Sequence, residues 1–200
     1  MDQLHNKHDW DNVLRWMKHE KLYSSYDRVL FMVNVGNVGQ RGFHWSVVEA
    51  WLGSTESAKP ARPWKIIYHD SLLPLNDTTS FYYKKGVEYC ALACEYLERK
   101  LIVDKEVSEL YINRHLVWKQ RFGQQSVEFP GTKMPPMQEN GHDCGVLACL
   151  TAECLCLGYS LDTIESTNPK FIAAHRNRIL MSIIYEKYFE PSLAMEFLLY

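Results

Sequence analysis

The chain has 200 residues, a formal net charge of −2 at pH 7, 46% hydrophobic residues and 23% charged residues. This length suits one domain with a sizeable core, and the proportions exclude an intrinsically disordered protein. Phosphate binding requires clustered Lys and Arg, and the sequence holds no basic block, so nucleic acid is not expected as a partner. We therefore expect a single folded domain over residues 1–200.

The opening segment, "MDQLHNKHDWDNVLRW", contains no long apolar stretch, and no segment of the chain reaches the length of a membrane span. We therefore expect neither a signal peptide there nor insertion into a membrane. Residues 9–23 mix apolar and charged side chains at helical spacing, which predicts a short amphipathic helix.

Three β-rich segments follow in the first half of the chain. They are "RVLFMVNV" at 28–35, "FHWSVVEAWL" at 43–52 and "WKIIYHDSL" at 64–72. The glycine-rich turn at 36–42 and the polar, proline-bearing loop at 53–63 separate them. Short strands with polar ends, joined by loops, indicate a small, mostly antiparallel sheet.

The second half is mainly helical. A helix is predicted over 87–100, and residues 101–115 either extend this helix or form another. A short strand is predicted over 116–122. Residues 128–143 hold three prolines and two glycines and are expected to form a loop. Residues 145–157 are apolar nearly all round, which is typical of a buried helix, and Asn168 before Pro169 starts a last helix over 169–189. The whole pattern predicts an α+β domain, with helices flanking a small central sheet.

Six cysteines lie inside apolar segments rather than along loops, which indicates reduced thiols in an intracellular protein. Zinc binding is an alternative, because His142 and Cys144 are two residues apart and other cysteines follow. However, no CxxC pair occurs, and a continuous helix would spread these side chains around its surface. We expect no metal site, and we expect three of the later cysteines to be core residues: Cys149, Cys154 and Cys156.

Cys144 stands where the polar loop meets the apolar helix, in "MQENGHDCGVLACL" (137–150). The backbone N–H groups and the dipole of a helix start favour negative charge, so a thiolate is stabilised there. Gly145 allows a substrate backbone to approach closely. Gln138, six residues before the cysteine, is an amide donor that could bind an oxyanion together with the Cys144 N–H.

His44 begins one predicted strand, and Asp70 falls at the end of the next. If these strands pair, their polar ends meet, and the carboxylate holds the imidazole in one tautomer. Taken singly, each residue has an ordinary explanation: a core cysteine, a strand histidine, a turn aspartate, a solvated loop glutamine. Taken together, His44, Asp70, Gln138 and Cys144 supply the base, orienting acid, oxyanion donor and nucleophile that cysteine catalysis requires.

In this combination the sequence resembles the Ulp/SENP cysteine proteases, which act on SUMO and related ubiquitin-like modifiers. The resemblance lies in "HW" at 44–45, "HDS" at 69–71, "QENGHDCG" at 138–145 and the strand-like "VLFMVNV" before the histidine. It implies a papain-like fold with the nucleophile at the N-terminus of a buried central helix. It also implies that Trp45 covers a narrow tunnel for the Gly-Gly tail of the modifier.

The resemblance further implies hydrolysis, through a thioester, of the peptide or isopeptide bond after the modifier's C-terminal glycine. No cofactor is expected, and the expected partners are SUMO or a relative and its conjugates, bound by a monomer. The expected location is the nucleus or cytoplasm, in a host cell if the chain is a pathogen effector. Alternatives are a deubiquitinase or polyprotein peptidase of the same fold, an effector-type acetyltransferase and an inactive modifier-binding module.

Overall fold

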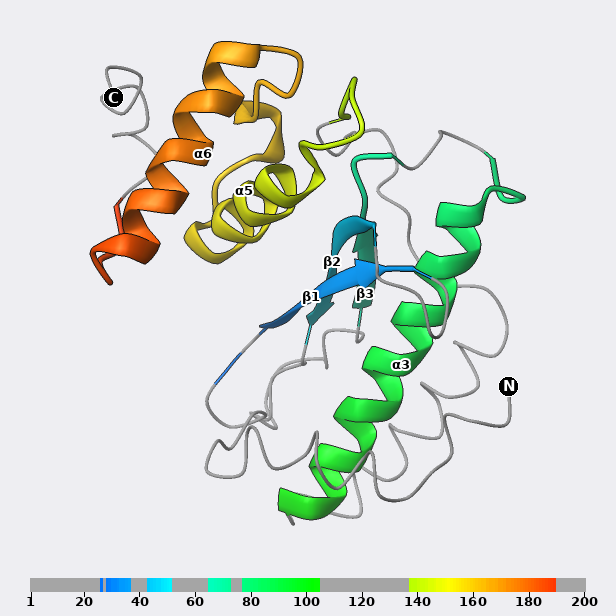
Figure 1. Cartoon of the computed structure of the whole chain (residues 1–200). Coiled ribbons are helices and arrows are strands. Elements are labelled where there is room, and N and C mark those ends of the chain that lie inside the picture. Colours follow the sequence, from blue (N-terminus) through cyan, green and yellow to red (C-terminus); the bar gives the residue numbers. More distant parts are fainter. Residues whose placement is uncertain are drawn as a thin grey trace. The chain divides into compact units, whose positions relative to one another are not determined.

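The computed structural model describes residues 26, 28–36, 43–51, 65–72, 77–104 and 137–189 (Figure 1). The helix expected at 9–23, the strand expected at 116–122 and the loop at 53–63 lie outside the described residues. The described residues combine a three-stranded sheet with helices, so the predicted α+β class is confirmed.

The sheet is antiparallel, with strand order β1-β2-β3. Its strands are β1 (Arg28–Val35), β2 (His44–Trp51) and β3 (Lys65–His69). The middle strand, β2, is buried at every position from 46 to 50, as expected for a strand with neighbours on both sides. Because β3 ends at His69, Asp70 is the first residue beyond the strand.

The helical elements are α3 (Phe81–Asp104), α5 (Cys144–Leu157), the short 3-10 helix η1 (Leu161–Thr163) and α6 (Pro169–Ile184). Helix α6 begins as predicted, because the Asn168 side chain accepts hydrogen bonds from the backbone N–H groups of Lys170 and Phe171. It ends at Ile184 and not at 189, since Glu186 has a φ of 49°, outside the right-handed helical region.

Helix α3 begins six residues before the predicted start. The Ser80 hydroxyl accepts a hydrogen bond of 3.1 Å from the Tyr83 N–H, which is the bond of an N-terminal cap. The apolar periodicity used for the prediction becomes regular only from residue 87, and it therefore missed the first turns.

Two compact units interleave along the chain. The first comprises Met1–Phe31, Val48–Tyr68 and Gly86–Glu128, and the second comprises Met32–Val47, His69–Lys85 and Phe129–Tyr200. Every residue singled out above as a candidate site residue belongs to the second unit. The single domain over residues 1–200 stays a prediction.

The core of the second unit forms where α5 packs against α6 and η1. Apolar side chains from all three elements fill it: Val146, Leu147, Leu150, Cys154, Leu161, Ile164, Phe171, Ile172 and Ile179. This packing fixes α5 and therefore the position of its first residue, Cys144. No helix within the described ranges is both long enough and apolar enough to cross a membrane.

A candidate active site at the start of helix α5

A buried histidine–aspartate pair lies where β2 begins and β3 ends. The Nε2 atom of His44 lies 2.7 Å from Oδ1 of Asp70, and the two side chains are 1% and 0% exposed. The same carboxylate oxygen accepts a 2.7 Å hydrogen bond from the backbone N–H of Leu72. Since a carboxylate only accepts, Nε2 carries a proton, and Asp70 fixes both the orientation and the tautomer of the ring.

With Nε2 protonated in the neutral ring, Nδ1 of His44 is the nitrogen that can take up a proton. Nδ1 is buried, and no hydrogen-bond partner for it exists among the described residues. A buried basic nitrogen without a partner is costly unless the site uses it. This makes Nδ1 the atom through which the ring can act as a base.

Tyr82, in the first turn of α3, packs against the His44 ring. Its ring meets the His44 ring edge-on, with centroids 5.1 Å apart. Burial raises the pKa of the Tyr82 hydroxyl, and negative charge at Asp70 and at Cys144 raises it further. Asp70 and Cys144 are therefore both close enough to Tyr82 to act on it electrostatically.

Cys144 is the first residue of α5 and is 6% exposed. Its position exposes the thiol to the positive end of the helix dipole and to backbone N–H groups that have no partner within the helix. Beside it, a Cβ atom built on Gly145 would lie 3.7 Å from Cδ1 of Trp45. Trp45 follows His44 in the chain, so this contact joins the start of β2 to the start of α5.

Asp143, the residue before the cysteine, is held by two partners. Asn140 donates through Nδ2 to Oδ2 at 2.6 Å, and Arg176 of α6 donates to Oδ1 at 2.5 Å. The Asn140 side-chain oxygen in turn accepts from the backbone N–H groups of His142 and Asp143, both at 3.0 Å. These bonds shape the turn that leads into α5 and so fix the backbone of Cys144.

Gln138 is buried in the same loop. Its side-chain oxygen accepts a hydrogen bond of 2.7 Å from the Ser71 hydroxyl, and its Nε2 donates to the Asn140 carbonyl at 2.5 Å. Its backbone N–H donates to the Ser71 carbonyl at 2.9 Å. The loop before the cysteine is thereby joined to the turn that follows Asp70.

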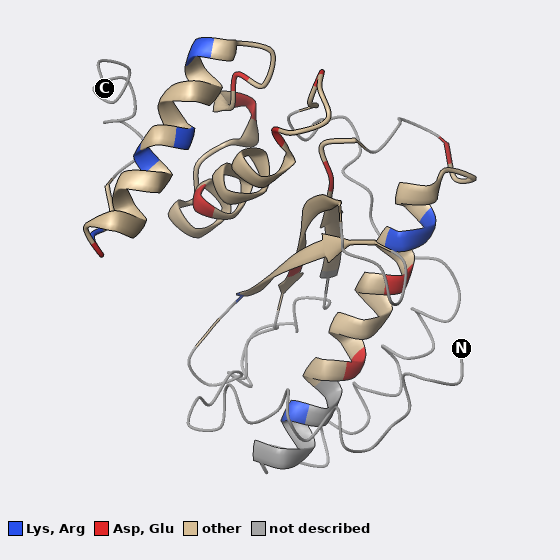
Figure 2. Cartoon of the chain, viewed as in Figure 1, with Lys and Arg blue, Asp and Glu red and all other residues tan. Residues whose placement is uncertain are grey.

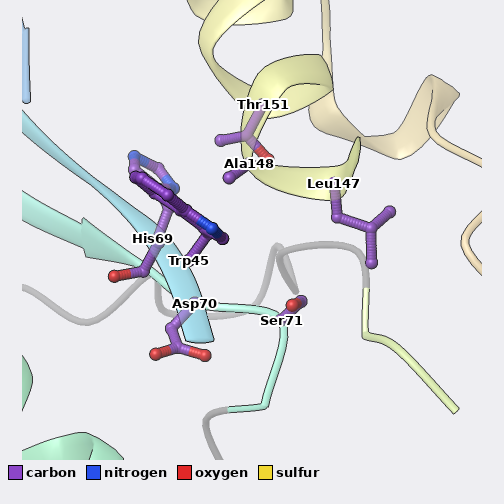
Figure 3. A pocket seen from close by; sticks show the side chains of 8 residues that line it. Trp45, His69, Asp70, Ser71, Leu147, Ala148 and Thr151 are labelled. Atoms are coloured by element: carbon purple, nitrogen blue, oxygen red, sulfur yellow. The ribbon is translucent and has the colours of Figure 1, made fainter. Parts of the chain in front are cut away.

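A small pocket opens between these elements (Figure 3). Leu147, Ala148 and Thr151 of α5 form one side, and Trp45, Ser46, His69, Asp70 and Ser71 form the other. The side chain of Trp45 is 42% exposed. It is thus positioned to contact a second molecule as well as α5.

The remaining cysteines differ from Cys144 in their surroundings. Burial raises the pKa of the Cys90 thiol to about 12, and burial also raises the pKa values of Cys149 and Cys154, so these thiols stay protonated at neutral pH. The prediction that Cys156 is a core residue was wrong: it is exposed, because it lies on the face of α5 turned away from α6 and η1. Within the described ranges, no three His, Cys, Asp or Glu side chains are grouped so that they could hold a metal ion.

The structure therefore brings His44 and Asp70 into contact, places Trp45 against Gly145, and positions Gln138 between Asp70's turn and the approach to Cys144. It shows no hydrogen bond, within the described residues, between the Cys144 sulfur and the His44 ring. Such contacts are often long before substrate binds. No sequence pattern indicated that Tyr82 belongs to the site, and Ser71 appeared only within the motif at 69–71.

A buried histidine–aspartate pair, together with a cysteine at a helix start in an α+β fold, is typical of the papain-like cysteine peptidases. The chain belongs to the Ulp1 protease family: the family's C-terminal catalytic domain matches residues 2–181. Among solved structures, one described as "SUMO protease Ulp1 with the catalytic cysteine oxidized to a sulfinic acid" is 16% identical, with a TM-score of 0.44. The match covers 96% of this chain and 63% of that chain.

Proposed function

We propose that the chain is a cysteine peptidase that cleaves the bond after the C-terminal glycine of SUMO or another ubiquitin-like modifier. In this proposal Cys144 is the nucleophile, His44 the general base, Asp70 its orienting acid and Gln138 a donor to the oxyanion. The observation that carries the proposal is the 2.7 Å bond between His44 and Asp70, which leaves Nδ1 of a buried imidazole as an unpartnered base.

In the proposed reaction, each of these residues has one role. Nδ1 of His44 takes the thiol proton, and the Cys144 sulfur attacks the carbonyl carbon of the terminal glycine. The backbone N–H of Cys144 and the side-chain amide of Gln138 stabilise the oxyanion of the tetrahedral intermediate. His44 then gives the proton to the leaving amine. In the second half of the reaction His44 takes a proton from water, the water oxygen attacks the thioester carbonyl, and the Cys144 sulfur leaves and regains the proton.

Aromatic side chains support a protein substrate with a slender tail. Trp45 lies against Gly145 and is 42% exposed, so a peptide that reaches Cys144 passes its aromatic ring. Phe43 and Phe81 stack with ring centroids 5.9 Å apart, although they are 56% and 37% exposed. Exposed aromatic side chains of this kind are typical of surfaces that bind another protein.

The test is a panel of modifiers that carry a C-terminal glycine electrophile, including SUMO and ubiquitin, incubated with wild-type protein and with Cys144→Ala. We expect an adduct with at least one modifier in wild type and none in Cys144→Ala. The variant should keep a wild-type thermal midpoint, because alanine suits the first turn of a helix.

Cys156→Ala is the matched control, since Cys156 is an exposed thiol on the same helix. This variant should form the adduct as wild type does, which would exclude the exposed Cys156 thiol as the group that reacts with the electrophile. If folded wild type forms no adduct with any modifier, or if Cys144→Ala still does, the proposal is wrong. The alternative functions to test would then be those of a polyprotein peptidase, an acetyltransferase or an inactive binding module.

Among the described residues, Figure 2 shows Lys and Arg at separate places along α3 and along α6. An acetyltransferase that binds acetyl-coenzyme A and an inositol phosphate requires clustered cations. Excess acetyl-coenzyme A in a labelling assay separates that activity from peptide hydrolysis directly.

A further inference from the structure

Ser71 stands at the turn just beyond Asp70 and is 7% exposed. It bonds to Gln138 twice: its hydroxyl donates to the side-chain oxygen at 2.7 Å, and its carbonyl accepts from the backbone N–H at 2.9 Å. One residue therefore fixes both the backbone and the side chain of the proposed oxyanion donor. The two residues are 67 apart in the sequence, and the bond between their side chains is buried.

The two partners of the Gln138 amide also determine which way it faces. Its oxygen takes the Ser71 hydroxyl proton, and its nitrogen donates to the carbonyl of Asn140. A flipped amide would bring its oxygen against the Asn140 carbonyl, so that two acceptors would face each other. The nitrogen has two hydrogens, and Asn140 is its only acceptor among the described residues, so one hydrogen remains for a substrate.

We infer that Ser71 is a positioning residue for the oxyanion hole: its hydroxyl holds the Gln138 amide so that Nε2 faces the reacting carbonyl. The inference rests on the proposed peptidase function. Without the hydroxyl, the amide loses the bond that orients it, while the substrate's ground-state contacts are unchanged. An interaction made only in the transition state lowers kcat and kcat/KM together and leaves KM unchanged.

The test is steady-state hydrolysis of a modifier bearing a C-terminal fluorogenic amide, chosen as the one that forms the adduct with wild type. Ser71→Ala should lower kcat by roughly ten- to a hundredfold with KM within about twofold, and Gln138→Ala by about ten- to a thousandfold. The double variant should be no slower than Gln138→Ala alone, because both substitutions remove one shared interaction. Ser71→Thr, which restores a hydroxyl, should recover part of the rate lost in Ser71→Ala.

Ser160→Ala is the matched control. Ser160 is exposed and does not line the pocket, and its hydroxyl donates a hydrogen bond of 3.0 Å to Asp162 Oδ2, so the substitution also removes a serine hydroxyl that donates to a side chain. It should keep the wild-type kcat. Thermal midpoints of all variants separate loosened folding from lost catalysis, and the side-chain amide NMR signals of Gln138 should shift in Ser71→Ala but not in Ser160→Ala.

The outcomes distinguish the two proposals. A wild type that neither forms an adduct nor turns over overturns the proposed function and this inference with it. An active wild type with Ser71→Ala within twofold of its kcat, or with effects of Ser71→Ala and Gln138→Ala that multiply, overturns the inference alone. An active Gln138→Ala also overturns it, because there would then be no donor for Ser71 to position.

Discussion

Replacing Asp70 with asparagine removes the negative charge and keeps the shape of the His44 pair. The carbonyl oxygen of asparagine can take the place of Oδ1, which accepts both from His44 Nε2 and from the Leu72 N–H at 2.7 Å. The amide nitrogen then occupies the place of Oδ2. The imidazole keeps its orientation, and the substitution isolates the effect of the charge.

The size of that effect follows from geometry and burial. When His44 becomes an imidazolium in the transition state, a full negative charge at hydrogen-bonding distance stabilises it, by up to about 4 kcal/mol at the effective dielectric constant of a protein site. Hydrogen bonds to charged groups exceed neutral ones by about 1–1.5 kcal/mol, which sets the lower bound. We therefore expect Asp70→Asn to lower kcat by about ten- to a thousandfold, with little change in KM.

The assay is the same fluorogenic hydrolysis, with binding to Cys144→Ala and to Asp70→Asn/Cys144→Ala compared by calorimetry. Asp77→Asn is the control: Asp77 is half-buried, and among the described residues its carboxylate accepts hydrogen bonds from the N–H and the hydroxyl of Thr79, at 2.9 and 2.6 Å. It should leave kcat unchanged. If Asp70→Asn stayed within twofold of wild type while Asp77→Asn or Glu49→Gln lost activity, another carboxylate would orient the histidine and the reasoning would fail.

Two predictions concern stability. A Cβ on Gly86 would lie 2.4 Å from Cδ1 of the fully buried Tyr68, so Gly86→Ala should lower the free energy of unfolding in urea by about 1–2 kcal/mol, despite alanine's helix propensity. Gly145→Ala is the control, because its Cβ would make an ordinary contact at 3.7 Å and should not destabilise the fold. Equal effects of the two substitutions would refute the clash. Burial, and after it the Arg178 cation, lower the pKa of His175 from 6.5 to about 4 in the folded protein. As the pH falls from 6.5 to about 4, the unfolded chain therefore binds a proton at this histidine before the folded protein does. The free energy of unfolding should fall over this pH range, by at most about 3 kcal/mol. His175→Gln should flatten the fall; an unchanged pH dependence would contradict it.

Local patterns in the sequence predicted much of the fold. The β-branched run at 28–35 gives β1 with the expected bounds, and Asn168–Pro169 gives the start of α6. The change from polar loop to apolar run places Cys144 at the start of α5. Each of these signals lies within a few residues of the feature that it specifies, because caps, turns and strand propensity act locally.

Features that depend on contacts distant in sequence could not be predicted in the same way. No residue adjacent to Gln138 in the sequence indicates that Gln138 forms two hydrogen bonds with Ser71. In the same way, no residue adjacent to Tyr82 indicates that its ring packs against His44. Cys156 shows the reverse case: its apolar neighbours predicted burial, but the positions of α6 and η1 decide which face of α5 is covered.

The candidate site lies where secondary structure elements end. His44 is the first residue of β2, Asp70 follows the last residue of β3, and Cys144 is the first residue of α5. At such positions backbone N–H and C=O groups have no partner within their own element, so side chains and neighbouring turns must supply one. The bonds of Ser71 and Asn140 meet this need, and the same bonds orient the groups proposed to react. A substitution at either position should therefore change catalysis before it changes overall stability, which is why kcat and the thermal midpoint must be measured on the same variants.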